Sequence, residues 1–400
     1  MKLRLPNGEI REYDHQLKVI KGLLAAHLNI PANQQIFISG NHIITSDTKK
    51  FSKNDMLDLA INPIDNYVVC SIQNSELLSS AGYVPLITPS TIVRDREFAK
   101  MKSIPRFYDT NSIYLDNDKR KNEAETKAKP FLEQFEKTKS ERRRNLKSLL
   151  KKLNQRTKVI TTCNSPYIVL LKNFVASCEA NGIDIRENLI VFPMDQETEE
   201  ACEQLNVLSF YREDYYGPST STHGKYGDRD FVICMFMKNA IVQDMFELGQ
   251  DIIFMDVDMV WLKDPIQRLE SIATINSYDF MFMFDGMNPR FQPLYYNSGF
   301  FYAKNNPFSR RTWKVIYDNY DTVWAYRSQQ TPLNIVMNYF GNLGLRTHRL
   351  DPHEFMNGHL ITPNRKNTVD KRTYLVHASW TLNLEFKIRN LKAKNLWFLS

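Results

Sequence analysis

Long apolar runs are missing from this sequence of 400 residues, and none approaches the ~20 residues that a membrane-spanning helix needs. The N-terminal stretch MKLRLPNGEIREYD also lacks the apolar core of a secretory signal peptide. We therefore expect no transmembrane segment and a cytoplasmic protein.

Cysteine is scarce, and no two cysteines form a CxxC pair. The cysteines are Cys70, Cys163, Cys178, Cys202 and Cys234. An odd number of widely spaced cysteines is atypical of a disulfide framework or a zinc site, and it indicates reduced thiols. We expect each to have a structural role, because free cysteine is usually buried.

An even spread of positive charge is also missing, although the net charge is +7. Residues 117–156 contain 14 Lys and Arg against 6 Asp and Glu, which accounts for the whole excess. The rest of the chain is near neutral and carries no general nucleic-acid footprint, so no nucleic-acid partner is expected.

Residues 1–73 predict a small β-rich domain. KLRL, EIREYD, QIFISG and NYVVCSI are typical of strands, and the Asn-Gly pair in PNGE is a strong hairpin signal. Helical spacing is found at Leu17, Ile20, Leu24 and Leu28. This order, with the words IPANQQIFISGNHII, resembles ubiquitin. No Gly-Gly tail follows Ile72, so the resemblance implies a fused ubiquitin-like β-grasp domain, used for protein docking or only for packing.

Residues 74–156 predict a linker followed by a basic helical arm. Residues 74–116 have mixed polarity, whereas 117–156 are charged and helix-prone, with Pro130 near the start of a helix. An apolar stripe runs through Leu146, Leu149, Leu150 and Leu153. Two interpretations stay open: a basic surface for an acidic partner or a membrane, or a solvated helix that packs through its stripe.

Residues 157–400 predict an α/β domain. Strands are expected in KVITTC, NLIVFPMD, DIIFMDVD, YDFMFMFD and YNSGFFYA, with helices between them in NFVASCEANG, ACEQLN and FVICMFMKNAIVQDMFELGQ. Alternating strands and helices are typical of a mixed, mostly parallel sheet, and ligands of such sheets bind at the carboxyl ends of the strands.

Asp256 and Asp258 follow an apolar strand in IIFMDVDMVWLKDP. Alternation along a strand predicts that they point to the same side. Converging carboxylates repel unless a cation lies with them, and Mg²⁺ or Mn²⁺ commonly bridges such carboxylates to a substrate phosphate. Because a lone DxD is common, a strand end with two solvated aspartates remains an alternative.

Several blocks follow one another between residues 159 and 397. They are VITTCNSPYIVLLKN, VFPMDQET, ELGQDIIFMDVDMVWLKDP, NSGFFYAKNN, QQTPLN, DPHEFMNG and HASWTLNLEFKIRNLK. The ordered set resembles the nucleotide-diphospho-sugar transferases of glycosyltransferase family 77 and, more distantly, family 8. The resemblance implies a Rossmann-like GT-A fold, a retaining mechanism and a manganese-binding DxD. It also implies a UDP-sugar donor and a protein or glycan acceptor.

The resemblance implies roles for individual residues. Asp256, Asp258 and His377 would hold Mn²⁺ or Mg²⁺, with a core histidine as the alternative for His377. The expected donor-binding residues are Thr161, Thr162, Asn164, Lys238, Asp256, Val257, Asn297, Gly299 and Lys387. The lysines would meet the diphosphate, the residues after the first strand would face the base, and Gly299 would let a sugar approach. Solvated lysines, turn chemistry and a strand bulge are the alternatives.

The expected catalytic residues are Asp258, Gln330 and Asp285. Gln330 would lie near the reacting face of the sugar, whereas Gln329 stands where the family often has an acid. Glutamine is not a useful nucleophile, so we expect a front-face substitution that depends on positioning and charge stabilisation. Asp285 would bind a sugar hydroxyl or serve only as a turn aspartate, and residues 219–231 would be a loop over the donor or an ordinary surface loop.

Two other functions fit parts of the sequence. DVDMV after an apolar strand also matches the opening of haloacid-dehalogenase phosphatases, but no acidic pair follows downstream and about 100 residues of α/β pattern precede it. A ubiquitin-like head, a basic arm and an inactive transferase-like body would make an adaptor. The presence of Asp256, Asp258 and His377 favours the transferase.

Overall fold

The structure is a computed structural model of the 400-residue chain. It describes isolated strands between Lys2 and Thr88 and then Asp118–Ser400, except residues 154, 214, 217–228, 287–294, 343–344, 363–368 and 382. The chain divides into two compact units. One contains residues 1–104, 286–295 and 337–346, and the other contains residues 105–285, 296–336 and 347–400.

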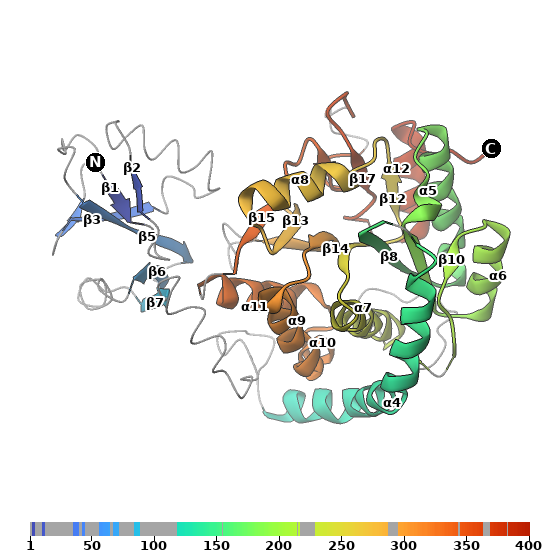
Figure 1. Ribbon diagram of the computed structural model, residues 1–400, viewed down its shortest axis with the longest axis horizontal. Helices are drawn as coiled ribbons and strands as arrows, with labels where there is room; N and C mark the ends of the chain where they lie inside the picture. Colours follow the sequence, from blue (N-terminus) through green and yellow to red (C-terminus); the bar gives the residue numbers. More distant parts are fainter. Residues whose placement is uncertain are drawn as a thin grey trace. The chain divides into compact units, whose positions relative to one another are not determined.

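The first unit contains a mixed sheet of short strands (Figure 1). The strands are β1 (Lys2–Arg4), β2 (Ile10–Glu12), β3 (Gln35–Ser39), β4 (His42–Ile44), β5 (Met56–Ile64), β6 (Tyr67–Ser71) and β7 (Val84–Thr88). Their order is β2-β1-β5-β3-β4, and β6 pairs with β5 and β7. The four strands expected in residues 1–73 are confirmed, but the expected helix over residues 17–28 and the Asn-Gly turn lie outside the described residues.

The second unit is built on a seven-stranded sheet. Its strands are β8 (Thr157–Cys163), β9 (Leu189–Pro193), β10 (Leu208–Ser209), β11 (Asp251–Met255), β13 (Phe280–Phe284), β14 (Tyr296–Ala303) and β15 (Thr347–Arg349). The order is β10-β9-β8-β11-β14-β13-β15, and β14 runs antiparallel to both neighbours while the other pairs are parallel. The expected mixed, mostly parallel α/β sheet is confirmed.

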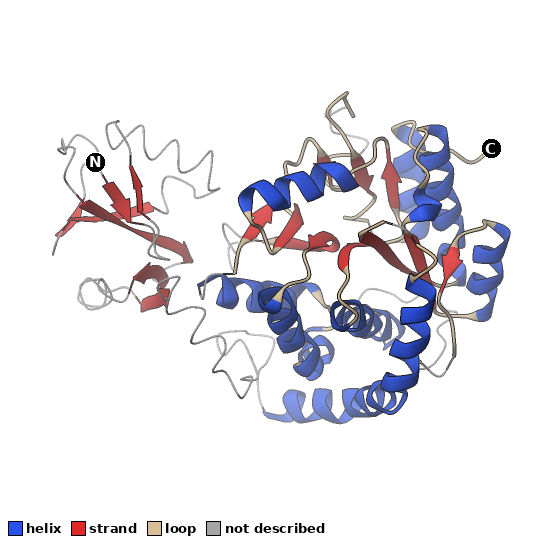
Figure 2. Cartoon of the chain, in the orientation of Figure 1, coloured by secondary structure: helices blue, strands red, loops and turns tan. Residues whose placement is uncertain are grey.

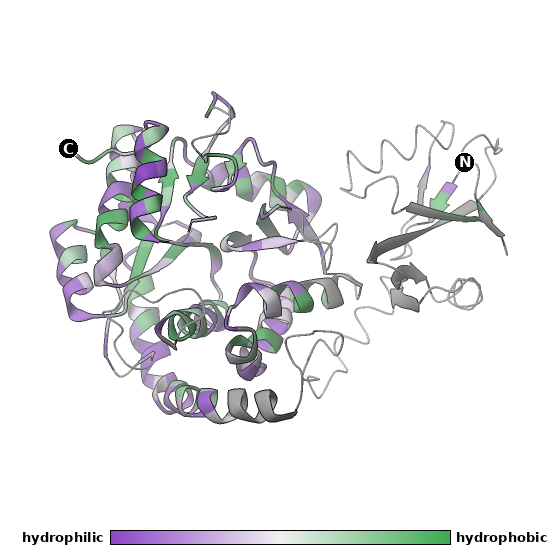
Figure 3. Cartoon of the chain, turned by 180° about the vertical axis from the view of Figure 1, so that it is seen from behind, coloured by the Kyte–Doolittle hydropathy of each residue, from purple (hydrophilic) through white to green (hydrophobic). Residues whose placement is uncertain are grey.

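Helices lie on both sides of this sheet (Figure 2). They are α4 (Asp118–Leu150), α5 (Ile168–Ala180), α6 (Gln196–Gln204), α7 (Arg229–Glu247), α8 (Ile266–Asn276), α9 (Pro307–Asp318), α10 (Tyr320–Tyr326), α11 (Gln330–Asn342) and α12 (Leu384–Ala393), with short 3₁₀ turns at Ser165–Tyr167 and Ile185–Glu187. On one side α7 packs on β11, α9 and α10 pack on α7, and α4 packs on α10; on the other side lie α5, α8 and α12. Figure 3 shows α7 green over most of its length, as a buried helix should be.

A small second sheet packs the C-terminal part of the chain against the core of the main sheet. It contains β12 (Met259–Trp261), β17 (Leu375–His377) and β16 (Phe355–Met356) in the order β12-β17-β16. The apolar residues of these strands are buried in the core that also holds residues of β8, β11 and α5. Because β12 follows β11 after a short loop, β17 is brought beside that loop.

Helix α4 differs from its prediction at one point. It begins at Asp118, so Pro130 lies inside the helix and not near its start. Leu146, Leu150 and Leu153 are buried, which confirms packing through the apolar stripe.

The charged side of α4 also takes part in packing. Arg142 is 1% exposed and its Nε lies 2.5 Å from Oδ2 of the equally buried Asp244 on α7, which also accepts from Nε of Arg143 at 2.7 Å. A buried ion pair of this kind fixes α4 against α7.

The expected burial is confirmed for three of the four cysteines whose side chains the structure describes. Cys163, Cys178 and Cys202 are buried free thiols, and Cys234 is half-buried. Burial raises the pKa of Cys202 to about 12, so this thiol is unreactive at neutral pH. Among the helices that the structure describes, none has the length and apolar character of a membrane span.

Candidate active site

Asp256 and Asp258 lie in the loop between β11, which ends at Met255, and β12, which begins at Met259. The prediction that strand alternation aligns them is therefore wrong, because neither residue is in a strand. Hydrogen bonds from outside fix the loop instead. The backbone N–H of Asp256 donates to the carbonyl of Gly299 at 2.7 Å, and Ala378 N–H donates to the carbonyl of Asp258 at 2.9 Å.

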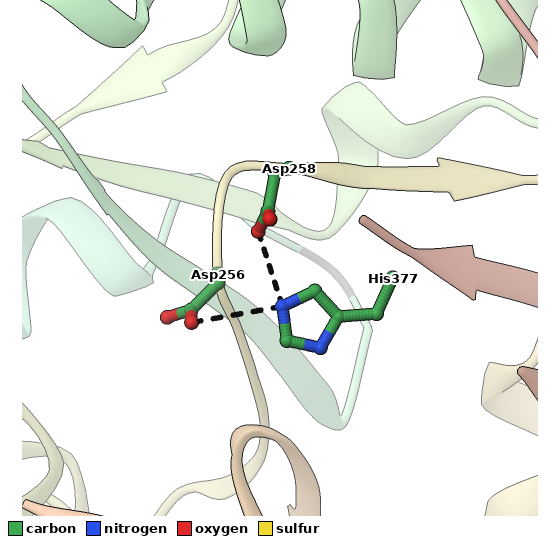
Figure 4. A group of neighbouring side chains, drawn as sticks. All are labelled: Asp256, Asp258 and His377. Atoms are coloured by element: carbon green, nitrogen blue, oxygen red, sulfur yellow. Dashed lines mark ion pairs between the residues drawn. The ribbon is translucent and has the colours of Figure 1, made fainter. Parts of the chain in front are cut away.

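His377 completes a cluster with these two carboxylates (Figure 4). It ends β17, where it pairs with Met259, so the ladder places its ring over the loop. Its Nε2 lies 3.2 Å from Oδ1 of Asp258 and 3.8 Å from Oδ2 of Asp256. Asp258 and His377 are buried, whereas the side chain of Asp256 is 29% exposed and gives the cluster an open side.

The cluster fits a divalent cation. The ligand atoms of Asp256, Asp258 and His377 lie within 4.8 Å of one another, close to twice the ~2.1 Å of a Mg²⁺–oxygen bond. Two carboxylate oxygens and one imidazole nitrogen suit Mn²⁺ or Mg²⁺. The space beside them depends on Gly299, because a Cβ there would lie 2.5 Å from both Oδ2 of Asp256 and Cε1 of His377.

Each carboxylate also has a lysine partner. Lys238 of α7 forms an ion pair with Oδ1 of Asp256, and Nζ of Lys387 on α12 lies 2.5 Å from Oδ2 of Asp258. Burial raises the pKa of Asp258, but Lys387 and His377 outweigh burial and hold this pKa below its ordinary value. Asp258 is therefore an ionised carboxylate.

A second polar cluster centres on Asp285, at the end of β13. Oδ1 of Asp285 accepts from Nδ2 of Asn297 and, at 3.2 Å, from Nε1 of Trp380, while Oδ2 accepts from Nε2 of Gln330 at 2.7 Å. Burial raises the pKa of Asp285, and these three hydrogen bonds offset part of the increase. The two clusters are joined through Asn297, whose Oδ1 accepts from Gly299 N–H at 2.7 Å.

Asn334 on α11 explains why Gln330 faces this cluster. Its Oδ1 accepts from Tyr296 N–H at 2.8 Å and its Nδ2 donates to the Tyr296 carbonyl at 2.9 Å, which ties α11 to β14. One turn earlier on α11, Gln330 Oε1 accepts from Ser298 N–H at 3.2 Å.

The neighbouring Gln329 has different surroundings. It is fully buried and donates to Oδ1 of Asn239 at 2.7 Å. This glutamine, which stands where the family often has an acid, contacts α7 next to Lys238 and packs away from solvent.

The remaining expected donor residues lie at the ends of β8 and β11, which are neighbours in the sheet. Thr161, Thr162 and Asn164 are buried at the carboxyl end of β8. Val257 packs into the core between the two aspartates. Of residues 219–231, the structure describes only the first residues of α7.

Sequence reasoning missed Tyr167 and Trp380. Burial raises the pKa of Tyr167, and Lys387, Asp258 and Asp256 act on its hydroxyl electrostatically, so this residue of the quoted block VITTCNSPYIVLLKN lies close to the first cluster. Trp380 stands three residues after His377 and bonds Asp285 directly. For Trp380, the signal available in the sequence was an aromatic residue close to His377, the expected metal ligand.

Comparison with known proteins gives the following matches. The family model described as Nucleotide-diphospho-sugar transferase matches residues 184–391. The uncharacterized protein At1g28695 of Arabidopsis thaliana is 24% identical over 248 residues, which cover 60% of this chain and 72% of that protein. Arabinosyltransferase RRA2 of the same plant is 24% identical over 168 residues, or 36% of each chain. The galactosyltransferase LgtC, solved with donor and acceptor sugar analogs, superposes with a TM-score of 0.39 at 11% identity, covering 61% of this chain and 97% of that chain.

Proposed function

This chain belongs to the nucleotide-diphospho-sugar transferase family, and from that premise we propose a metal-dependent, retaining glycosyltransferase. It transfers a sugar from a UDP-sugar to a hydroxyl group of a glycan or protein acceptor. The observation that carries the proposal is the convergence of Asp256, Asp258 and His377 with Lys238 and Lys387 on either side.

The charges of this cluster suit a diphosphate together with a divalent cation. The two carboxylates and the two lysines balance each other in charge. A divalent cation held by Asp256, Asp258 and His377 adds two positive charges, and its chemistry is to stabilise negative charge on the departing diphosphate. In the bound state we expect Lys238 and Lys387 to turn from the aspartates toward the phosphates, where ammonium groups act as point charges.

The second cluster serves the transferred sugar. Asp285, Asn297 and Gln330 hold one another in place by the hydrogen bonds described above, which favours positioning over nucleophilic attack. The amide of Gln330 and the carboxylate of Asp285 orient sugar hydroxyls, and the acceptor hydroxyl attacks from the face that the diphosphate leaves. The departing diphosphate takes the acceptor proton, so no enzyme nucleophile is required.

Donor recognition extends along the sheet. Thr161, Thr162 and Asn164 at the end of β8 meet the nucleoside, with Tyr167 beside them. The main chain at Val257 contacts the donor between the two aspartates. The relative RRA2 is named for arabinosyl transfer; whether a hexose or a pentose is moved by this chain is decided by the experiment below.

We also propose that residues 1–73 form a ubiquitin-like domain, joined by residues 74–156 to the transferase domain of residues 157–400. The strand order β2-β1-β5-β3-β4, with β1 antiparallel to β2 and parallel to β5, supports this assignment. Its role is docking of a protein partner. Deleting residues 1–73 should spare donor hydrolysis, and loss of hydrolysis would contradict a docking role.

The proposal is tested by incubating the protein with a panel of UDP- and GDP-sugars in the presence of Mn²⁺. The release of free nucleotide diphosphate is measured for each donor. We expect chelator-sensitive hydrolysis of one UDP-sugar and its loss in Asp258→Asn. Mn²⁺ at 100 times its Kd should stabilise the wild type by about 2.7 kcal/mol and leave the variant's Tm unchanged. If no donor in the panel releases nucleotide diphosphate and calorimetry detects no nucleotide binding, the proposed enzyme activity is contradicted and the adaptor hypothesis is favoured.

A further inference from the structure

Trp380 is an exposed aromatic residue in a strained backbone conformation. Its relative exposure is 52%. In the part of the chain that the structure describes, Ile275 is the only other large apolar residue that is exposed. Its φ is +58°, in the left-handed region that a bulky side chain rarely adopts. Such conformations persist where the surroundings impose them, and they cluster at functional sites.

The surroundings hold the indole by its edge and leave a large part of it open. Nε1 donates to Oδ1 of Asp285 at 3.2 Å, which fixes the ring beside the second polar cluster. The ring of His359 lies 5.1 Å from the Trp380 ring, centroid to centroid, at an interplanar angle of 44°. Two aromatic side chains from distant segments therefore meet at one edge of the candidate sugar site.

A close backbone contact brings these segments together. Gly358 N–H donates to Oγ of Ser379 at 3.0 Å, and a Cβ at position 358 would lie 1.7 Å from the Ser379 carbonyl oxygen. Asn357 donates from Nδ2 to the carbonyl of Phe284 at 2.7 Å, next to Asp285. Glycine at 358 is thus required for His359 to reach Trp380, and the pair is built into the fold.

We propose that Trp380 and His359 form a platform that binds the acceptor, and that the acceptor is a sugar ring. This inference rests on the proposed function and names the acceptor class that it leaves open. The apolar C–H face of a pyranose or furanose packs on an exposed indole, whose polar edge is occupied here by Asp285. A short serine or threonine side chain offers no such face. The hydrogen bonds from Trp380 through Asp285 to Gln330 connect the platform directly to the residues that position the transferred sugar.

The test separates acceptor binding from donor chemistry. The full-length protein is assayed with Mn²⁺ and its preferred UDP-sugar, first without acceptor and then with methyl glycosides and oligosaccharides of glucose, galactose and arabinose. Unglycosylated Ser/Thr peptides are assayed in parallel. Trp380→Ala should raise the KM for a sugar acceptor about tenfold, a larger effect than its effect on donor hydrolysis, which follows from the lost hydrogen bond to Asp285. Trp380→Phe keeps a ring and should keep most of the affinity. Ile275→Ala, at the other exposed apolar residue, is the matched control.

Three results would overturn the inference. Transfer to peptides alone would contradict a sugar acceptor. An acceptor KM that Trp380→Ala does not change would contradict a binding platform at Trp380. An equal loss of donor hydrolysis in Trp380→Ala, with an unchanged Tm, would assign Trp380 to the donor. Absence of donor hydrolysis in the wild type would instead contradict the proposed function itself, and the two failures are therefore distinguishable.

Discussion

A Cβ atom at Gly299 would lie 2.5 Å from Oδ2 of Asp256, so the absence of a side chain on β14 is what lets this carboxylate turn toward His377. The same Cβ would lie 2.5 Å from Cε1 of His377 and 3.0 Å from Oδ1 of Asn297. Real Cβ atoms do not approach other atoms this closely, because interiors are packed to contact distance. Gly299 therefore sets the positions of two proposed metal ligands and of a residue from the sugar cluster.

Gly299→Ala should reduce turnover on the order of 10²-fold, because displacing positioned groups by about 1 Å costs that much. It should also weaken Mn²⁺ binding, measured by calorimetry without any donor. The matched control is Gly341→Ala on α11, where an added Cβ meets nothing within 4 Å. Full Mn²⁺ affinity in Gly299→Ala would show that the two ligands do not act together.

The adjacent glutamines should separate stability from catalysis. Gln329→Leu removes a buried hydrogen bond to Asn239 and should destabilise the protein by about 1–3 kcal/mol, with little change in kcat of the folded fraction. Gln330→Leu removes the contacts to Asp285 and Ser298 and should lower kcat on the order of 10-fold or more. Chemical denaturation and steady-state kinetics give the two quantities. The opposite pattern would place Gln329 at the reaction centre.

The first cluster could be predicted only in part from the sequence. The apolar strand before Asp256 is a local pattern, and residue type alone indicates a metal. The geometry is not local, because the loop is fixed by hydrogen bonds with Gly299 and Ala378, which lie far away in the sequence. Strand alternation consequently gave the wrong reason for a convergence that the fold produces in another way.

Other features escaped prediction for related physical reasons. Proline usually ends a helix because it lacks an N–H and clashes with the preceding turn, yet α4 continues through Pro130. The charged, helix-prone residues around it and the packing of its later turns outweigh that one residue. The partners of Arg142 and Trp380, namely Asp244 and Asp285, are pairings across the fold that no short window of sequence contains.

The buried pair between α4 and α7 should control stability. Asp244→Ala leaves the guanidinium of Arg142 buried without its carboxylate and should cost about 3–5 kcal/mol. Arg142→Met should cost less, since Asp244 keeps Arg143 and the hydroxyl of Tyr216. Glu179→Ala, which breaks the more exposed pair with Arg186, should cost about 0–1 kcal/mol. Denaturant titrations of the three variants test this order, and equal effects would mean that α4 does not depend on the pair.

Asp285 should give the stability of the protein a specific pH dependence. Burial raises its pKa in the folded state above the ordinary value of about 3.9. Between those two pKa values the folded state binds more protons than the unfolded state, so the free energy of unfolding falls as pH rises through that window. Asp285→Asn does not titrate, and its Tm relative to wild type should therefore increase from about pH 4 toward neutrality.

Asp370→Asn is the control of opposite sign, because hydrogen bonds from Arg372 lower the pKa of Asp370. The stability from that pair is present above the ordinary pKa and is lost as pH falls, so the relative Tm of Asp370→Asn should decrease as pH rises. Thermal melts of the three proteins from about pH 3 to about pH 7 measure both slopes. Parallel curves for Asp285→Asn and wild type would show that Asp285 is not held in its hydrogen-bonded network with Asn297, Gln330 and Trp380.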